Sequence, residues 1–126
     1  MPAPAPAVAP VQLFHYRARI IAVYDGDTCK VDIDLGLGVW VRGEKLRLHR
    51  INAPELHGAE AVAGRAARDQ LKTLIEGKEV LLQTIEDRRE KYGRYLAEIW
   101  LAPADAAPLN VNDPLVTAGH ARYQDY

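Results

Sequence analysis

Apolar and polar residues alternate along much of the first half of the chain, which is the pattern of β-strands with one buried face. Residues 13–24 are rich in aromatic and β-branched side chains, and this composition favours a strand. The clearest alternation follows in residues 29–35, where every second side chain is apolar; it places Cys29 in the core. A third strand begins at Val39, and we expect residues 43–45 to interrupt it.

A fourth alternating stretch surrounds Arg47, where Leu46 and Leu48 are separated by polar residues. The alternation slips before Ile51, which indicates a bulge or bend that redirects the following side chains. Pro54 then ends the strand because proline has no N–H to donate. These residues lead directly to a candidate carboxylate at position 55.

The apolar period changes from two to 3.6 beyond Glu55. Ala67, Leu71, Leu74 and Ile75 fall on one face of a helix that we expect over residues 60–76. Gly77 suits the left-handed residue that ends a helix. The remaining pattern predicts, in order, a strand over 79–86, a charged turn over 87–94, a strand over 95–101, a loop over 102–110 and a short helix from 112 to 119.

Three strands, a helix, two strands and a short helix are the element order of a five-stranded OB-fold, a β-barrel with helices in the α+β class. The 126 residues suffice for one core. Residues 1–12, which are rich in proline and alanine, predict a flexible lead-in, and residues 13–126 form the expected domain. We expect it to be a monomer.

Composition narrows the classes of partner. The chain is 48% hydrophobic and 26% charged, with a formal charge of −1, so any contact with a polyanion must come from a local patch. A single cysteine excludes an internal disulfide and a cysteine-based zinc site. No apolar run reaches the length of a membrane helix. The opening residues lack the features of a secretory signal, which predicts a cytoplasmic protein. A secreted protein from which the signal has been removed would have the same opening residues.

Three charged motifs stand in order along the chain. Asp25-Gly26-Asp27-Thr28 forms a turn between the first two strands, because Asp-Gly is a strong hairpin signal and glycine accepts positive φ. Arg47 leads to Ala53-Pro54-Glu55, and Lys91-Tyr92-Gly93-Arg94 lies in the charged turn. Each motif alone is an ordinary turn or surface segment, but the three motifs together, in this order around one helix, are a much more specific signal.

In this combination the chain resembles the staphylococcal nuclease family, the thermonucleases, over residues 13–123. The resemblance implies an OB-fold barrel and calcium-dependent hydrolysis of phosphodiester bonds in DNA and RNA. It implies that Arg47 and Arg94 are catalytic arginines and that Glu55 is the general base for the attacking water. Arginine and glutamate side chains suit this reaction, since guanidinium groups stabilise the negative charge that develops on a phosphoryl group and a carboxylate can accept a proton from water.

The resemblance also implies a Ca²⁺ site. Asp27 matches the metal-binding carboxylate, Asp25 is a second acidic residue beside it, and Asn52 and Ala53 stand where the family usually has aspartate and threonine. The amide oxygen of Asn52 and the carbonyl of Ala53 can still bind calcium, but the site loses one negative charge, so we expect weaker binding.

Substrate contacts are implied for Lys91 and Tyr92. The loop after Glu55 is poor in lysine, which predicts weak, salt-sensitive binding. We expect a preference for single-stranded or accessible nucleic acid, because a small cleft that reads the backbone needs an exposed phosphate. The four histidines show no spacing typical of metal ligands; His49 contacts either the barrel wall or the substrate.

Two alternatives to a nuclease remain open from the sequence. A catalytically silent OB-fold module would bind nucleic acid or protein without hydrolysis, since fold alone does not imply activity. A phosphodiesterase specific for small nucleotides would need the same catalytic groups without a long substrate groove.

Overall fold

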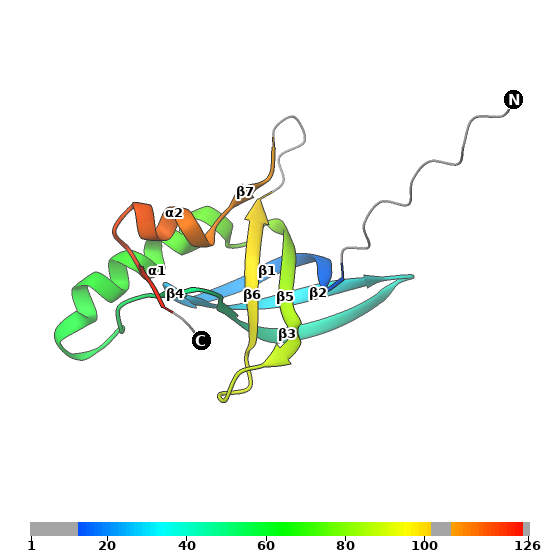
Figure 1. The fold of residues 1–126 in the computed structure, drawn as a ribbon, viewed down its shortest axis with the longest axis horizontal. Helices are drawn as coiled ribbons and strands as arrows, with labels where there is room; N and C mark the ends of the chain where they lie inside the picture. The colour runs from blue at the N-terminus through cyan, green and yellow to red at the C-terminus, as the bar shows by residue number, and fades with distance from the viewer. Residues whose placement is uncertain (1–12, 102–106, 125–126) are drawn as a thin grey trace, which may run out of the picture.

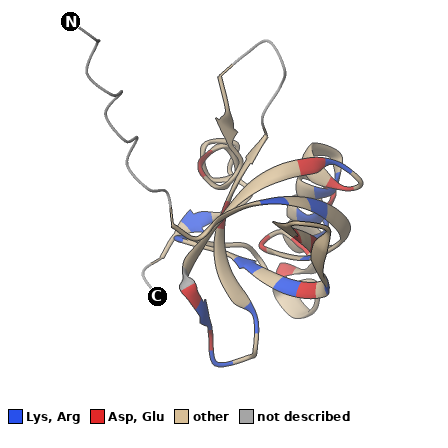
Figure 2. Ribbon diagram, turned by 90° about the vertical axis from the view of Figure 1, so that its right-hand side faces the viewer, with Lys and Arg blue, Asp and Glu red and all other residues tan. Residues whose placement is uncertain are grey.

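The computed structural model describes residues 13–101 and 107–124. The proline-rich segment predicted at 1–12 and most of the loop predicted at 102–110 lie outside these ranges. No helix in the described part of the chain is long and apolar enough to cross a membrane. Acidic and basic positions are mixed over the ribbon (Figure 2), as the small net charge predicts.

Five strands form a closed barrel (Figure 1). Its strands, in spatial order, are β3 (Val39–Leu48), β2 (Thr28–Gly36), β1 (His15–Asp25), β5 (Glu79–Arg89) and β6 (Tyr95–Leu101). Neighbours in this order are antiparallel, and a short parallel pairing between β3 and β6 closes the barrel. The predicted OB-fold is confirmed.

The remaining elements cover one end and one edge of this barrel. Two short strands, β4 and β8, pair with each other, and β7 extends the sheet beside β6. A 3₁₀ turn leads into the long helix α1, and α2 follows β7 (Figure 1). Their bounds are β4 (Ile51–Asn52), the 3₁₀ turn (Gly58–Glu60), α1 (Ala61–Ile75), β7 (Leu109–Asn110), α2 (Asn112–Thr117) and β8 (Arg122–Tyr123).

The core lies inside the barrel and beneath α1. Helix α1 buries Gly64, Ala67, Leu71 and Ile75, which is the face that the 3.6-residue period predicted, and Cys29 is fully buried on β2. Burial raises the pKa of the Cys29 thiol to about 12, because a thiolate loses its hydration inside an apolar core. This cysteine is therefore a packing residue rather than a nucleophile.

Several boundaries differ from the prediction: the loop predicted at 102–110 ends in β7, both helices are slightly shorter than expected, and three differences concern the strands that carry the site. Residues 43–45 do not interrupt β3, because Gly43 adopts a φ of 70° within a bulge and the pairing with β2 continues on both sides. Strand β5 extends to Arg89 through an irregular register, so the charged turn is shorter than expected. The break before Ile51 is a bend in which Arg50 adopts a φ of 70°, and this bend separates β3 from β4.

Candidate active site

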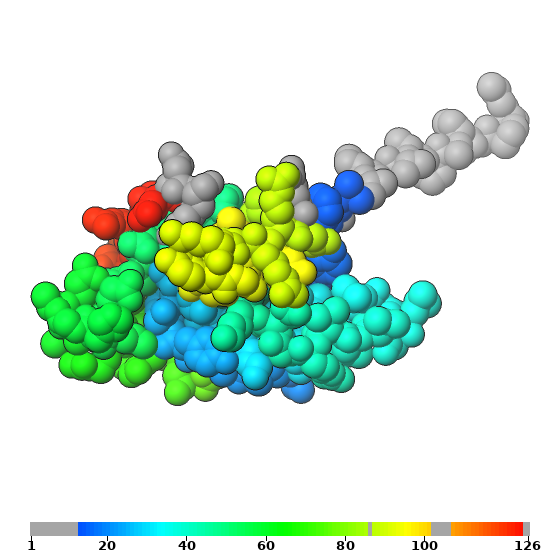
Figure 3. Space-filling view, turned by 90° about the horizontal axis from the view of Figure 1, so that it is seen from below, coloured from blue at the N-terminus to red at the C-terminus, as the bar shows by residue number. Residues whose placement is uncertain are grey.

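An open pocket of about 1080 Å³ lies where the β1–β2 turn, the end of β3, the segment after β4 and the β5–β6 turn meet. Seen from below in Figure 3, the β5–β6 segment projects between α1 on one side and the β2–β3 hairpin on the other. All nine residues predicted for the site line this pocket: Asp25, Asp27, Arg47, Asn52, Ala53, Glu55, Lys91, Tyr92 and Arg94. The structure brings them together; their roles stay predictions.

Gly26 shapes the turn between the two aspartates. A Cβ at this position would lie 2.7 Å from the Cβ atoms of both Ala53 and Ala67, which is too close for any side chain. Gly26 does not adopt the positive φ that the sequence analysis expected. Glycine is required here because α1 and the segment after β4 approach the turn directly, so the spacing of three elements depends on small residues.

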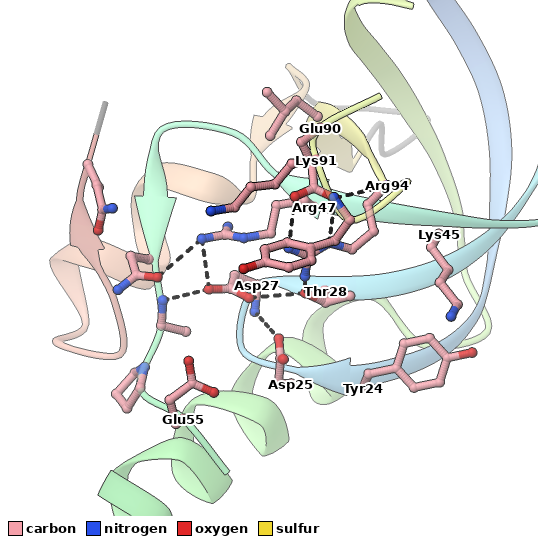
Figure 4. A pocket seen from close by; sticks show the side chains of 16 residues that line it. Tyr24, Asp25, Asp27, Thr28, Lys45, Arg47, Glu55, Glu90, Lys91 and Arg94 are labelled. Atoms are coloured by element: carbon pink, nitrogen blue, oxygen red, sulfur yellow. Dashed lines mark hydrogen bonds and ion pairs between the residues drawn. The ribbon is translucent and has the colours of Figure 1, made fainter. Parts of the chain in front are cut away.

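Asp27 is buried at the floor of the pocket (Figure 4). Its Oδ2 accepts a hydrogen bond of 2.7 Å from the Ala53 N–H, and its Oδ1 accepts one of 3.1 Å from the Thr28 hydroxyl. Burial, followed by the neighbouring Asp25 carboxyl, raises the pKa of Asp27 to about 6, while the guanidinium of Arg47 opposes the shift. The side chain is therefore ionised at neutral pH but carries an unrelieved repulsion from Asp25.

Arg47 is the most buried cation of the pocket, with 6% of its side chain exposed. It donates from Nη1 to the Leu48 carbonyl at 2.7 Å and from Nη2 to Asn52 Oδ1 at 3.2 Å. The same Nη2 lies 3.2 Å from Asp27 Oδ2. Contacts on both sides of the guanidinium hold it rigidly, which is the state that a preorganised charge-stabilising group requires.

Arg94 reaches the same pocket from the β5–β6 turn. Glu90 accepts hydrogen bonds from its Nε at 3.0 Å and its Nη2 at 3.2 Å, and Thr28 accepts one from its Nη1 at 3.0 Å. The guanidinium of Arg94 lowers the pKa of Glu90 through these hydrogen bonds. Neither Glu90 nor Thr28 was assigned a role from the sequence, although Thr28 ends the first motif and Glu90 directly precedes the third. Thr28 bridges Arg94 and Asp27.

Glu55 lies on the segment between β4 and the 3₁₀ turn. Its N–H donates to Glu60 Oε2 at 2.9 Å, while its own carboxylate has no hydrogen bond or ion pair to any described residue. In Figure 4 it lies on the same side of the pocket as Asp25. A Cβ on Gly64 of α1 would lie 2.0 Å from the Glu55 carbonyl oxygen, so the helix backbone packs directly against this residue.

The pocket carries four acidic and four basic side chains, and within the described ranges only half of these form ion pairs. Asp27 pairs with Arg47, and Glu90 pairs with Arg94. Asp25 and Glu55 remain on the acidic side, and Lys45 and Lys91 on the basic side. Tyr92 is 70% exposed and lies below the Arg94 guanidinium, whose carbon is 5.4 Å from the ring centre.

A hard divalent cation fits the donor set of the pocket. Two carboxylates, the Asn52 amide and the Ala53 carbonyl are oxygen donors of the type that calcium prefers. Burial is the main cause of the raised pKa of Asp27, and the neighbouring Asp25 carboxyl adds to it; a cation bound beside the two carboxylates would favour their ionised forms. In the described part of the chain no three His, Cys, Asp or Glu side chains form a metal-binding group, so an amide would take the place of a third carboxylate.

His49 is not among the lining residues. Its Nδ1 lies 3.3 Å from Glu98 Oε2 on β6, outside the pocket. Of the two possibilities that the sequence left open, contact with the barrel wall is the one that the structure shows.

Comparison with known proteins agrees with this geometry. Residues 45–126 match the family model described as staphylococcal nuclease homologue. The chain is 29% identical to the thermonuclease of Staphylococcus hyicus over 111 residues, and 27% identical to the uncharacterized protein MJ1439 of Methanocaldococcus jannaschii over 129 residues. Each comparison covers 86% of this chain but 59% of the relative, so the chain spans less than two thirds of either relative.

The family match includes Arg47, Asn52, Glu55 and Arg94, whereas Asp27 precedes it. The match extends over more than half of the chain, and the barrel has the expected order of strands. The chain therefore belongs to the staphylococcal nuclease homologue family.

Proposed function

We propose that this protein is a calcium-dependent, sugar-nonspecific nuclease that hydrolyses phosphodiester bonds of DNA and RNA. One observation carries the proposal: two arginines from different elements, a glutamate whose carboxylate has no partner in the described part of the chain, and two neighbouring aspartates line a single pocket. The family match and the relationship to a protein named thermonuclease support it. The silent binding module does not require this convergence of charged groups, whereas a small-nucleotide phosphodiesterase would use the same groups.

Arg47 and Arg94 stabilise the negative charge that accumulates on the phosphoryl oxygens. Arg47 approaches from the barrel wall and Arg94 from the β5–β6 turn (Figure 4), so a phosphate between them receives donors from two sides. Both guanidinium groups are held by carboxylates of the protein, and they are therefore oriented before the substrate binds. Donors fixed in this way favour the transition state because they need no reorganisation during the reaction.

Glu55 acts as the general base. Its carboxylate has no partner among the described residues, so it can accept a proton from a water molecule in the pocket. Its backbone is fixed by the hydrogen bond to Glu60 and by the close packing of Gly64. A base that is fixed in position but free to accept a proton is suited to activating the nucleophile.

Asp27, Asp25, Asn52 and the Ala53 carbonyl would hold the calcium ion. When bound, the ion supplies positive charge that binds and polarises the scissile phosphate. The protein's own contribution is to hold these oxygens near Arg47, which already contacts both Asp27 and Asn52.

Lys91 and Tyr92 contact the bound nucleotide on the β5–β6 side of the pocket. None of these contacts requires a particular base. The absence of base recognition accounts for nonspecific cleavage of accessible or single-stranded polymer.

Digestion of heat-denatured DNA tests the proposal. The unaltered protein is assayed with millimolar calcium and with excess chelator, beside the Glu55→Gln and Arg47→Lys variants. We expect calcium-dependent loss of polymer, with a decrease on the order of a thousandfold for Glu55→Gln. Arg47→Lys keeps the charge but removes the bidentate geometry, so its activity should also fall.

Two matched variants control for nonspecific effects. Glu79→Gln and Arg19→Lys change exposed residues that do not line the pocket, and both should retain full activity. Absence of cleavage by the unaltered protein at every calcium concentration would contradict the nuclease and favour the silent binding module. Cleavage of a dinucleotide but not of a polymer would favour the small-nucleotide phosphodiesterase.

A further inference from the structure

The pocket extends beyond the predicted catalytic groups toward the β2–β3 hairpin. Lys45 on β3 and Tyr24 on β1 line this end, and neither belongs to a motif that the sequence analysis singled out. In Figure 4 Lys45 and Lys91 lie on opposite sides of Arg94. A phosphate held at the arginines would therefore have a cation on either side of it along the pocket.

Lys45 is an exposed cation that the fold leaves without an ion pair. No hydrogen bond or ion pair joins it to any other described residue. On the neighbouring strand its direct partner is Lys30, and like charges directly opposite each other destabilise a sheet. The side chain of Lys30 lies over Gly43. The hydrogen bond from the Gly43 N–H lowers the pKa of Asp32 most, and the Lys30 charge adds a smaller contribution, so Lys30 has a nearby carboxylate. Lys45, by contrast, forms no ion pair with a carboxylate of the described residues, and its side chain lines the pocket.

Tyr24 lies at an irregularity of β1. The pairing with β2 shifts between Val23 and Asp25, which leaves Tyr24 as the extra residue of a bulge, and bulges redirect side chains beside functional sites. The tyrosine is 41% exposed despite its large apolar ring, and it lines the pocket. An exposed aromatic ring beside an unpaired lysine is the combination with which proteins hold one base and its phosphate in single-stranded nucleic acid.

We propose that Tyr24 and Lys45 form a nucleotide subsite, in which the ring stacks on a base and the ammonium group binds a backbone phosphate. The proposal rests on the proposed function, because it treats the pocket as a nucleic-acid channel. It adds a binding site for a nucleotide that flanks the cleaved bond, so that a strand crosses the pocket from Lys91 to Lys45 and a long strand binds more tightly than a dinucleotide.

Binding to an inactive protein tests the subsite apart from hydrolysis. In a Glu55→Gln background, fluorescence anisotropy measures the affinity for a labelled single-stranded DNA of about 15 nucleotides, close to the upper site size of OB-folds, and for a dinucleotide. Lys45→Gln should weaken binding of the long strand by roughly fivefold at low salt and reduce the salt slope by about 0.7. Tyr24→Leu should weaken it on the order of tenfold, whereas Tyr24→Phe should retain the affinity.

Lys78→Gln is the matched control, because this exposed lysine lies in the turn between α1 and β5, away from the pocket. The ratio of long-strand affinity to dinucleotide affinity should fall in Lys45→Gln and Tyr24→Leu but not in the control. Equal effects of Lys45→Gln and Lys78→Gln, or equal losses for long and short ligands, would overturn the subsite.

Failures of the two proposals are distinguishable. If the unaltered protein cleaves DNA while the Lys45 and Tyr24 variants bind the long strand normally, the nuclease stands and the subsite is wrong. If no cleavage occurs but the ratio falls as expected, the subsite stands on a binding module. Absence of any binding to the long strand overturns both proposals.

Discussion

Two clusters of arginines and carboxylates flank the bend between β3 and β4, and they differ in how completely their charges are satisfied. In the pocket, Arg47 contacts Asp27 while Glu55 remains without a partner among the described residues. Three residues further along the chain, Arg50 donates to both Glu98 and Asp113. The first cluster surrounds an open pocket, whereas the second joins β6, α2 and the C-terminal strand into one unit.

The second cluster, which we call the Arg50 cluster, comprises His49, Arg50, Glu98, Asn110, Asn112, Asp113 and Tyr123. Glu98 accepts hydrogen bonds from Arg50, Asn110 and Asn112, and its side chain is only 9% exposed. A carboxylate whose oxygens are occupied in this way has little capacity to bind a ligand. The comparison teaches that an arginine beside a carboxylate indicates chemistry only where some of the charge stays open to solvent.

Replacement of Glu98 in the Arg50 cluster should therefore reduce the stability of the fold, whereas replacement of Glu55 in the pocket should reduce only the catalytic activity. Glu98→Ala removes the carboxylate that accepts from Arg50 Nε and Nη2, and it removes one of the three acceptors of the buried Asn112 Nδ2. It should therefore lower the free energy of unfolding by about 3 kcal/mol. Glu55→Ala removes no side-chain partner and should leave stability within about 0.5 kcal/mol, while hydrolysis falls on the order of a thousandfold. Urea denaturation and a DNA digestion assay of both variants measure the two effects. Equal losses of stability would contradict the distinction between the clusters.

A charge added to the pocket sharpens the comparison. Asn52→Asp supplies a third carboxylate beside Asp25 and Asp27, and it should tighten calcium binding by roughly fivefold, because affinity rises with the number of charged ligands. Calorimetric titration of calcium measures this change, and Gln70→Glu on α1 adds the same charge outside the pocket. An Asn52→Asp variant that binds calcium no more tightly than the control would argue against the proposed ligand set.

The smallest expected effect is on acid stability. Hydrogen bonds from Arg50, followed by Tyr123, lower the pKa of Asp113 below its ordinary value of 3.8. A lowered carboxyl pKa stabilises the fold above the ordinary value, and this stabilisation is lost as the pH falls through the lowered pKa. The difference in unfolding midpoint between the unaltered protein and Asp113→Asn should therefore exist at neutral pH and vanish in strong acid. A difference that is independent of pH would exclude the ion pair as its cause.

The barrel could be predicted because the spacing of apolar residues in each strand and helix is visible within a short stretch of sequence. Residues 29–35 alternate strictly and become β2, and the helical period around Leu71 becomes the buried face of α1. The bulge at Gly43 could not be predicted, because a glycine that interrupts a strand and a glycine in a bulge that lets the strand continue look the same in the sequence. Only the pairing with β2 separates them.

In the candidate site, only the residues that belong to a recognisable sequence motif could be predicted. Arg47 and Arg94 were found through the resemblance, and both line the pocket. The Arg50 cluster was not found, because Arg50 and Glu98 are 48 positions apart and nothing in either local segment indicates the other. Lys45 was missed for a related reason: an unpaired lysine can be recognised only after its neighbours in space are known.

The packing of Gly64 against Glu55 limits how this protein can be engineered. Replacing a helical glycine with alanine ordinarily raises stability by about 1 kcal/mol, and a design procedure guided by propensity would choose this position. Here the added methyl group would occupy the space of the Glu55 carbonyl and push the segment that carries the proposed base away from the helix. Thermostabilised variants should therefore keep this glycine and gain stability elsewhere on α1, for example at its solvent-facing positions.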